Sequence, residues 1–267
     1  MKGARILTGL LGAAWLSGCA NVEREFPNKS ADAYRIDQAK IALDKYKFDM
    51  AIENIGPVLA KKPKDPEVAY VASAAYAGRA GLRILDLFSE LARKVSTTAL
   101  LAIFAEHYIS SDDDRISDIE TAKDIIEGYG ERAADLDPDM NFFALFVFYS
   151  RIGVTLNRYG YTADTTDVDP AFKACSVSKF PDAAVDTVMT SLPRIIDTAS
   201  AVAAAGAGFD DLKGLTLPID LGWDPIPCSA NSNNIACLAV RNLVAQSKAE
   251  GGFGLGTGEY PCLTTTP

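Results

Sequence analysis

The stretch Ala39-Lys-Ile-Ala-Leu-Asp-Lys-Tyr-Lys-Phe-Asp-Met-Ala51 decides the fold. Its first half is an apolar helix that breaks near Lys45 to Lys47, and a second helix restarts at Phe48 and ends at Pro63. The second helix repeats apolar residues at helical spacing on one face: Ala51, Ile55 and Val58. Two helices joined by so short a break predict an antiparallel helical hairpin.

A third helix is signalled by Asp65-Pro66-Glu67, which offers a capping side chain, a first-turn proline and a first-turn acid. Its inner face is expected to carry small residues and one aromatic residue: Ala69, Ala72, Ser73 and Tyr76. Residues 36–94 therefore indicate two helical hairpins in succession, and the chain is predicted to be all-α.

These hairpins resemble tetratricopeptide repeats. The first repeat fills the family's small, aromatic, small, bulky and terminal proline positions with Ala39, Phe48, Ala51, Ile55 and Pro63. Arg35 and Gln38 replace the expected Trp and Leu. The second repeat loses the pattern after Gly81, and a third trace spans 122–138, where Ala133 and Pro138 fit. The resemblance is degenerate and covers roughly 100 residues. It implies stacked hairpins in a bundle or short solenoid with a concave face.

The charge balance excludes one class of partner. The chain of 267 residues has a formal net charge of −9. Removal of residues 1–18 takes away Lys2 and Arg5 and no acid, which leaves −9 − 2 = −11. Because nucleic-acid affinity depends on Lys and Arg, nucleic acid is not an expected partner.

The N-terminus predicts a lipid anchor. A short basic segment ends at Arg5, an apolar segment runs from Ile6 to Trp15, and Leu16-Ser-Gly-Cys19 follows. These four residues resemble the lipobox of bacterial lipoproteins, which implies signal-peptide removal after residue 18 and acylation of Cys19. Ala20 resembles the residue that sorts such proteins to the outer membrane, facing the periplasm. Residues 19–30 are expected to be a tether.

Residues 31–160 are expected to form the helical body. An apolar helix is predicted from Thr97 to Ile109, and the capping box Ser117-Asp-Ile-Glu120 is expected to open the next helix. Asp139 is expected to cap a strongly apolar helix from Met140 to about Tyr159. This helix belongs in the core of a bundle, or part of its aromatic surface lines a groove for an apolar or amphipathic ligand. Arg151 within it must be paired with a body carboxylate such as Glu106 or with an anionic ligand.

Residues 161–267 are expected to be a helical and irregular region packed on that body. A loop to Lys179 precedes a helix from Asp182, which Pro193 should kink. A final helix is predicted from Asn234 to Lys248, followed by a flexible arm rich in glycine at residues 251–258.

Four cysteines besides Cys19 form an even set in an exported chain, which predicts two disulfides. Cys228 and Cys237 bracket a short turn and should pair readily, because closing a short loop costs little entropy. That leaves Cys175 and Cys262, whose pairing would staple the tail to the helical body.

Catalytic and metal-binding signatures do not stand out. The sequence contains one histidine, His107, which limits imidazole-based metal sites and triads. It contains no Gly-x-Ser-x-Gly turn and no Cys-x-x-Cys pair. We therefore expect no enzyme, no metal and no cofactor.

The sequence favours a lipid-anchored binding scaffold of the cell envelope. Candidate ligand- or partner-binding residues on the concave face are Tyr70, Arg79 and Arg83, with Arg151 as a further candidate. The layout is similar to that of the helical lipoprotein associated with tripartite periplasmic transporters, which implies an accessory role in solute transport and an apolar or anionic ligand. The protein-binding lipoprotein of the outer-membrane barrel-assembly machine is the alternative, and a structural envelope protein is a third possibility.

Overall fold

The computed structural model describes residues 31–84, 86–87, 104, 107, 112–162, 165, 167–204, 227–246, 255 and 261–262. Over these residues the chain is all-helical, as predicted, and an isolated β-bridge joins Tyr161 and Val168. The α-helices are α1 (Asp32–Asp44), α2 (Phe48–Leu59), α3 (Pro66–Arg79), α6 (Asp113–Tyr129), α7 (Pro138–Gly160), α8 (Asp182–Ala204) and α9 (Ile235–Ala245).

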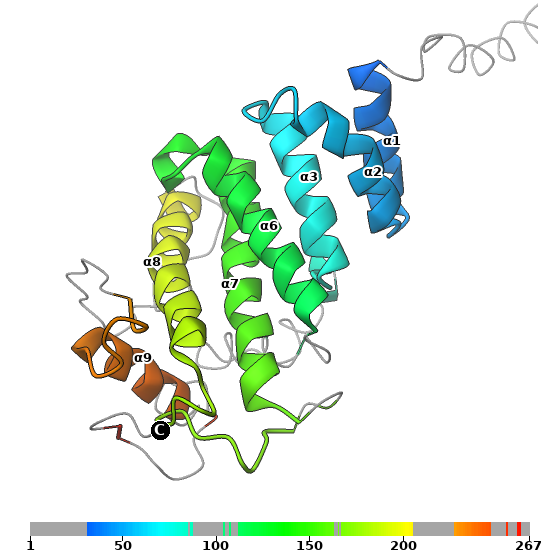
Figure 1. Cartoon of the computed structure of the whole chain (residues 1–267). Helices are drawn as coiled ribbons and strands as arrows, with labels where there is room; N and C mark the ends of the chain where they lie inside the picture. The colour runs from blue at the N-terminus through cyan, green and yellow to red at the C-terminus, as the bar shows by residue number, and fades with distance from the viewer. Residues whose placement is uncertain are drawn as a thin grey trace, which may run out of the picture.

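The helices lie in a row that follows their order in the chain (Figure 1). Each helix packs against the next, from α1 with α2 to α8 with α9. A small hydrophobic cluster joins α1, α2 and the outer face of α3, and a larger one joins the rest of α3 to α6, α7, α8 and α9. Ile125 of α6 packs against both clusters, so the row has one nearly continuous interior.

The first three helices match the sequence expectation closely. The chain breaks at residues 45–47, where Tyr46 adopts a positive φ of 55°. Asp65 caps α3 by accepting hydrogen bonds from the backbone N–H groups of Glu67 and Val68. The predicted apolar face of α2 is fully buried at Ala51, Ile55 and Val58. Local capping and periodicity are enough to place these elements.

Two predicted helix starts are wrong by a few residues. Helix α6 begins at Asp113 because Asp112 accepts from the N–H of Arg115, so Ser117 lies inside the helix. Helix α7 begins at Pro138 because Asp137 accepts from the N–H of Met140. In both cases an aspartate further upstream satisfies the free N–H groups first.

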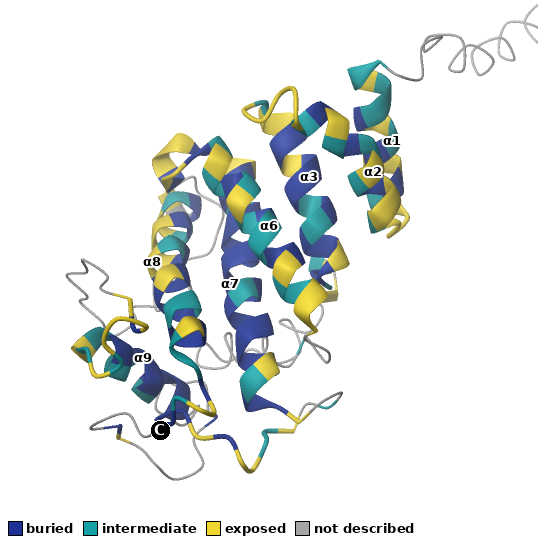
Figure 2. Cartoon of the chain, in the orientation of Figure 1, coloured by how far each residue is buried: buried dark blue, intermediate teal, exposed yellow. Residues whose placement is uncertain are grey.

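Helix α7 forms the centre of the larger cluster. Figure 2 shows it buried along nearly its whole length between α6 and α8. Phe104 stacks on Tyr149 with ring centroids 4.9 Å apart. The backbone of Phe104 also lies against Gly153, where an added Cβ would be 2.7 Å from the Phe104 carbonyl oxygen. The core interpretation of this apolar helix is therefore confirmed for most of its length.

The C-terminal region is tied together by cysteine pairs and one arginine. Cys175 lies at disulfide distance from Cys262 and Cys228 from Cys237, with Cα separations of 5.4 and 5.7 Å, as predicted. Arg241 of α9 has no exposed surface. Its guanidinium donates to the carbonyl oxygens of Ala174 and Phe180 and to Asp182 Oδ1.

The end of the chain differs from the expectation in two places. Helix α9 ends at Ala245, three residues before Lys248, because Gln246 adopts an extended conformation. Leu255, predicted to belong to a flexible arm, is fully buried and donates its N–H to the carbonyl of Val244. The leader, the tether and most of the predicted helix at 97–109 lie outside the described residues.

Candidate functional site

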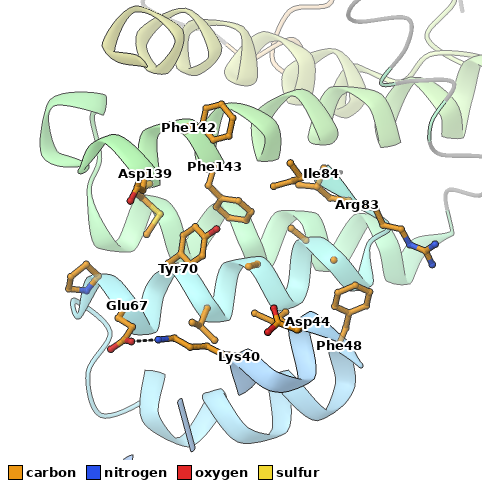
Figure 3. Close-up of a pocket in the computed structure, with 18 of the residues that line it drawn as sticks. Lys40, Asp44, Phe48, Glu67, Tyr70, Arg83, Ile84, Asp139, Phe142 and Phe143 are labelled. Atoms are coloured by element: carbon orange, nitrogen blue, oxygen red, sulfur yellow. Dashed lines mark hydrogen bonds and ion pairs between the residues drawn. The ribbon is translucent and has the colours of Figure 1, made fainter. Parts of the chain in front are cut away.

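A groove of about 960 Å³ lies between α1, α3 and α7 (Figure 3). Helix α3 forms its floor, α1 one wall and the first turns of α7 the other. Its apolar lining is Leu43, Tyr46, Phe48, Tyr70, Val71, Ala74, Ala77, Gly78, Leu82, Ile84, Met140, Phe142 and Phe143. Its charged lining is Lys40, Asp44, Glu67, Arg83, Asp137 and Asp139.

The floor of the groove consists of small side chains. Val71, Ala74, Ala77 and Gly78 follow helical spacing along the face of α3 that is turned to the groove. Small side chains on a helix face let another chain approach its backbone closely, as in close helix pairs. Val71, Ala77 and Gly78 are buried, with the Phe48 ring packed on Gly78, so the partly exposed Ala74 is the floor residue that a bound group would contact.

Aromatic rings flank the floor at both ends of the groove. Tyr70 packs edge-to-face on Phe143 with ring centroids 5.1 Å apart, and Tyr46 packs edge-to-face on Phe48 at 6.2 Å. Tyr70 is 40% and Tyr46 is 55% exposed. Such partly exposed aromatic rings are typical of binding surfaces, where they supply large apolar contact at low entropic cost.

Acidic side chains collect at the end formed by the first turns of α3 and α7. Glu67 pairs with Lys40 across the groove, while Asp137 and Asp139 lie on the α7 side. Burial, together with the negative charge of Asp139, raises the pKa of the Tyr70 hydroxyl above its ordinary value. The phenol is thus a neutral hydrogen-bonding group throughout the physiological pH range.

The opposite end opens into a second hollow of about 460 Å³ that shares four lining residues with the groove: Tyr46, Phe48, Gly78 and Arg83. The hollow adds Lys47, Asp49, Arg79 and Arg115. Arg83 lies 5.6 Å from the centroid of the Tyr46 ring, and among the described residues its closest carboxylate oxygen, on Asp86, is 3.9 Å away. The guanidinium of Arg83 is therefore available to a bound group.

Arg79 has a mainly structural environment. Its Nε and Nη2 atoms each donate to Asp118 of α6 at 2.7 Å, and Nη1 donates to Asp49 of α2 at 3.0 Å. The bidentate bond to Asp118 raises the pKa of the guanidinium further above its ordinary value. Arg79 thus joins α2, α3 and α6 beside the groove.

Arg151 lies apart from the groove, in the seam between α6, α7 and α8. It donates to Glu120 at 2.5 Å, to the carbonyl of Thr187 at 3.2 Å and to the hydroxyls of Thr190 and Ser191. Pairing with a body carboxylate is as expected, although the partner is Glu120, and Glu106 lies outside the described residues. These bonds satisfy a partly buried charge.

Of the three residues predicted for the concave face, Tyr70 and Arg83 line the groove, and Arg79 lies beside it in the hollow. The prediction missed the acidic end, Lys40 and the two cations Lys47 and Arg115. The signal for the acidic end was present, because Asp65-Pro66-Glu67 and Asp137-Pro138-Asp139 are similar helix starts. The two starts come close together because α7 packs beside α3, and no local sequence pattern predicts that packing.

No group of three or more metal-ligating side chains occurs among the residues that the structure describes. Within that same set, no helix is long and apolar enough to cross a membrane. His107 lies with Nε2 3.3 Å from the carbonyl oxygen of Gly81, a contact between its own segment and the end of the α3 turn.

Comparisons with known protein families, curated proteins and solved structures find no match to this chain. Functional inference therefore depends on the groove itself.

Proposed function

We propose that this chain is a lipid-anchored scaffold of the cell envelope that binds a partner segment in the groove between α1, α3 and α7. The proposal rests on the groove, in which partly exposed aromatic rings flank a floor of small residues. A surface of this kind is costly to leave in water and is characteristic of interaction sites.

The order of the helices supports the tetratricopeptide-like part of the proposal. Sequential helices pack in a row, and the groove runs along one side of α1 and α3, the first helices of the two hairpins. Repeat scaffolds of stacked hairpins bind partners on the corresponding concave face. The row of helices and the position of the groove support a scaffold of this kind.

Anchoring through Cys19 would hold the groove at the membrane, with residues 20–30 as the spacer. A Cys19→Ser variant should be unacylated and should leave the membrane fraction. An Asn21→Ser variant, which alters the spacer and keeps the four-residue motif, should remain membrane-bound. Mass spectrometry of the N-terminal peptide measures the acylation, and an unmodified Cys19 in a host with the lipoprotein pathway would refute the anchor.

A small apolar ligand is the second candidate occupant, as for an accessory of solute transport. The volume of about 960 Å³ favours it, because this lies at the upper end of the range of small-molecule sites. The many exposed charges along both walls favour a partner segment instead, since a small ligand is normally enclosed on most sides.

Site-specific photo-crosslinking in intact cells separates these candidates. A photoreactive phenylalanine analogue at Tyr70 should give an adduct that the same analogue at Ile196, exposed on α8, does not give. A second change, Ala74→Trp, fills the floor and should abolish the adduct. A protein-sized adduct supports the scaffold, and a small mass increment supports the ligand carrier. Adducts that are equal at both positions would contradict a role for the groove.

A further inference from the structure

Helix α9 contacts the chain at both members of the Cys175–Cys262 pair through two consecutive side chains. Arg241 donates to the carbonyl oxygen of Ala174, the residue next to Cys175. Asn242 bonds to the backbone of Cys262. These contacts involve no sulfur atom, so they can form whether the two cysteines are oxidised or reduced.

The side-chain amide of Asn242 matches the backbone of Cys262 at two points. Its Oδ1 accepts from the Cys262 N–H at 2.5 Å, and its Nδ2 donates to the Cys262 carbonyl oxygen at 3.3 Å. Because an amide carries both an acceptor and a donor, it fixes the direction of this backbone unit as well as its position. Leu255, earlier in the same tail, is fully buried and donates its N–H to the carbonyl oxygen of Val244. The tail is therefore attached to α9 at two places without help from a disulfide.

The segment around Cys175 is held by the same helix and by aromatic packing. Arg241 donates through Nη1 to the carbonyl oxygens of Ala174 and Phe180 at 2.7 and 2.8 Å, so one cation holds the loop on both sides of Cys175. The ring of Phe180 packs edge-to-face on Phe172, with ring centroids 5.8 Å apart. Hydrogen bonds and packing therefore give the Cys175 segment a fixed place beside α9.

Loop length alone does not select the Cys175–Cys262 pair. These two residues are 87 apart, whereas Cys237 and Cys262 are only 262 − 237 = 25 apart. In an unfolded chain the chance that two residues meet falls with about the 3/2 power of their separation, so Cys237 would meet Cys262 about six times as often as Cys175 would. Every other pairing of Cys175, Cys228, Cys237 and Cys262 also closes a shorter loop. The long pair therefore depends on contacts that bring its two segments together.

We infer that Arg241 and Asn242 are positioning residues for the formation of the Cys175–Cys262 disulfide. They hold the two thiols close together in the folded, reduced chain, so that this pair is selected over pairs that close shorter loops. Helix α9 docks the tail first, and the disulfide then secures it. The inference is independent of what the groove binds.

Oxidation by a small disulfide such as glutathione disulfide proceeds in two exchange steps. One cysteine thiolate attacks the glutathione disulfide, forms a mixed disulfide and releases a glutathione thiolate. The other cysteine thiolate attacks the protein sulfur of the mixed disulfide and releases the second glutathione thiolate. The two released thiolates take up the two protons of the cysteines, and two electrons pass from the cysteines to glutathione. The second step is intramolecular, so its yield depends on how closely the second cysteine is held.

The test removes the short pair, so that the long pair has to compete. The full chain carries Cys19→Ser, which removes the fifth cysteine, and Cys228→Ala, which leaves Cys237 as a free competitor. The alanine keeps the backbone N–H that donates to Asp186 Oδ1. The chain is reduced in urea, refolded in a glutathione redox buffer and trapped by alkylation. Mass spectrometry of its peptides then measures each disulfide.

The Cys175–Cys262 disulfide should exceed the Cys237–Cys262 disulfide while Asn242 is intact, against the preference from loop length. Adding Asn242→Ala should raise the ratio of the second disulfide to the first by about two- to ten-fold, the range for one net hydrogen bond. Asn54→Ala is the matched control, because the Asn54 amide bonds within its own helix, α2, and should leave the ratio unchanged.

Arg241 is tested by Arg241→Lys. This variant keeps a positive charge beside Asp182 and loses the planar guanidinium that reaches the carbonyl oxygens of Ala174 and Phe180. The ratio of disulfides should shift in the same direction as for Asn242→Ala. An unchanged ratio in one variant removes that residue from the inference, and an unchanged ratio in both overturns it, even where the variants lower the free energy of unfolding of the oxidised protein.

A majority of Cys237–Cys262 with Asn242 intact also overturns the inference, because loop length would then decide the pairing. If Cys228→Ala refolds poorly by circular dichroism, Cys237→Ala supplies a second background. Its competing pair, Cys228–Cys262, closes a loop of 262 − 228 = 34 residues, and the same shift with Asn242→Ala is expected.

Discussion

The ring of Phe48 lies directly against the backbone of Gly78, so that a Cβ added at Gly78 would be 2.2 Å from Phe48 Cε1. This contact brings the start of α2 onto the last turn of α3, and both residues line the groove and the hollow. The glycine therefore sets the separation of α2 and α3 at the end of the groove that adjoins the hollow. Because Gly78 has no side chain, the start of α2 can pack closely against α3.

Gly78→Ala should lower the free energy of unfolding by about 1 to 3 kcal/mol, because the methyl group must displace a packed aromatic ring. The matched control is Gly128→Ala in α6, where nothing lies within 4 Å of the added Cβ. That change should raise the free energy of unfolding by about 0.5 to 1 kcal/mol through helix propensity. Urea unfolding followed by circular dichroism measures both, and a neutral Gly78→Ala would contradict the close contact.

The two cysteine pairs should differ in what they contribute to stability. Cys175 and Cys262 are 87 residues apart, and Cys228 and Cys237 are 9 apart. In the chain-entropy description the long loop contributes about 4.5 kcal/mol and the short loop about 2.5 kcal/mol.

The double variant Cys175→Ala with Cys262→Ala should therefore lose more stability than Cys228→Ala with Cys237→Ala. All four sulfur atoms belong to buried residues, so the cost of removing thiol volume is similar in the two variants. Unfolding in urea without reductant gives the comparison. A larger loss from the short-loop variant would show that local packing outweighs loop entropy.

Removing the buried charge of Arg241 should lower the free energy of unfolding more than removing an exposed charge. Its pKa is lowered from its ordinary value because burial disfavours the charged form, against the opposing effect of Asp182. Arg241→Ala removes the cation beside Asp182, leaves Asp182 Oδ1 and two carbonyl groups without this donor, and should lower the free energy of unfolding by about 3 to 5 kcal/mol.

The control for Arg241 is Arg132→Ala. The Arg132 side chain is 76% exposed beside Asp135, and surface ion pairs contribute about 0 to 1 kcal/mol. Thermal unfolding of both variants under the same buffer gives the comparison. Equal and small losses would show that the buried pair is dispensable.

Tyr149 should make the protein sensitive to alkali. Its hydroxyl is buried with no hydrogen-bond partner among the described residues, and burial strongly raises the pKa of its phenol. Above the ordinary tyrosine pKa of about 10, the unfolded chain releases this proton and the folded chain keeps it, so stability falls as pH rises.

Tyr149→Phe should leave stability at pH 7 unchanged or slightly higher, because it removes an unsatisfied polar atom and keeps the ring stacked on Phe104. Above about pH 10 the variant should lose less stability than the parent chain. Unfolding midpoints from about pH 7 to 11 measure the difference. Parallel pH profiles for the two proteins would argue against a titrating Tyr149.

The sequence by itself determined the first three helices and the all-helical class. The break at residues 45–47, the Asp65 cap and the buried face of α2 follow from rules that act over one or two helical turns. The errors at the starts of α6 and α7 are local too, because several aspartates competed as caps and the upstream one was taken. The cysteine pairing followed from an even count and loop length.

Only the tertiary structure decided the groove. Asp139 is far from Tyr70 and Arg83 in the sequence, and it joins them in the groove only because α7 lies beside α3. The burial of Arg241 and the pairing of Arg151 with Glu120 depend in the same way on which helices become neighbours. Helical periodicity states which face of a helix is apolar, but the neighbour of that face is chosen by packing across the whole row of helices.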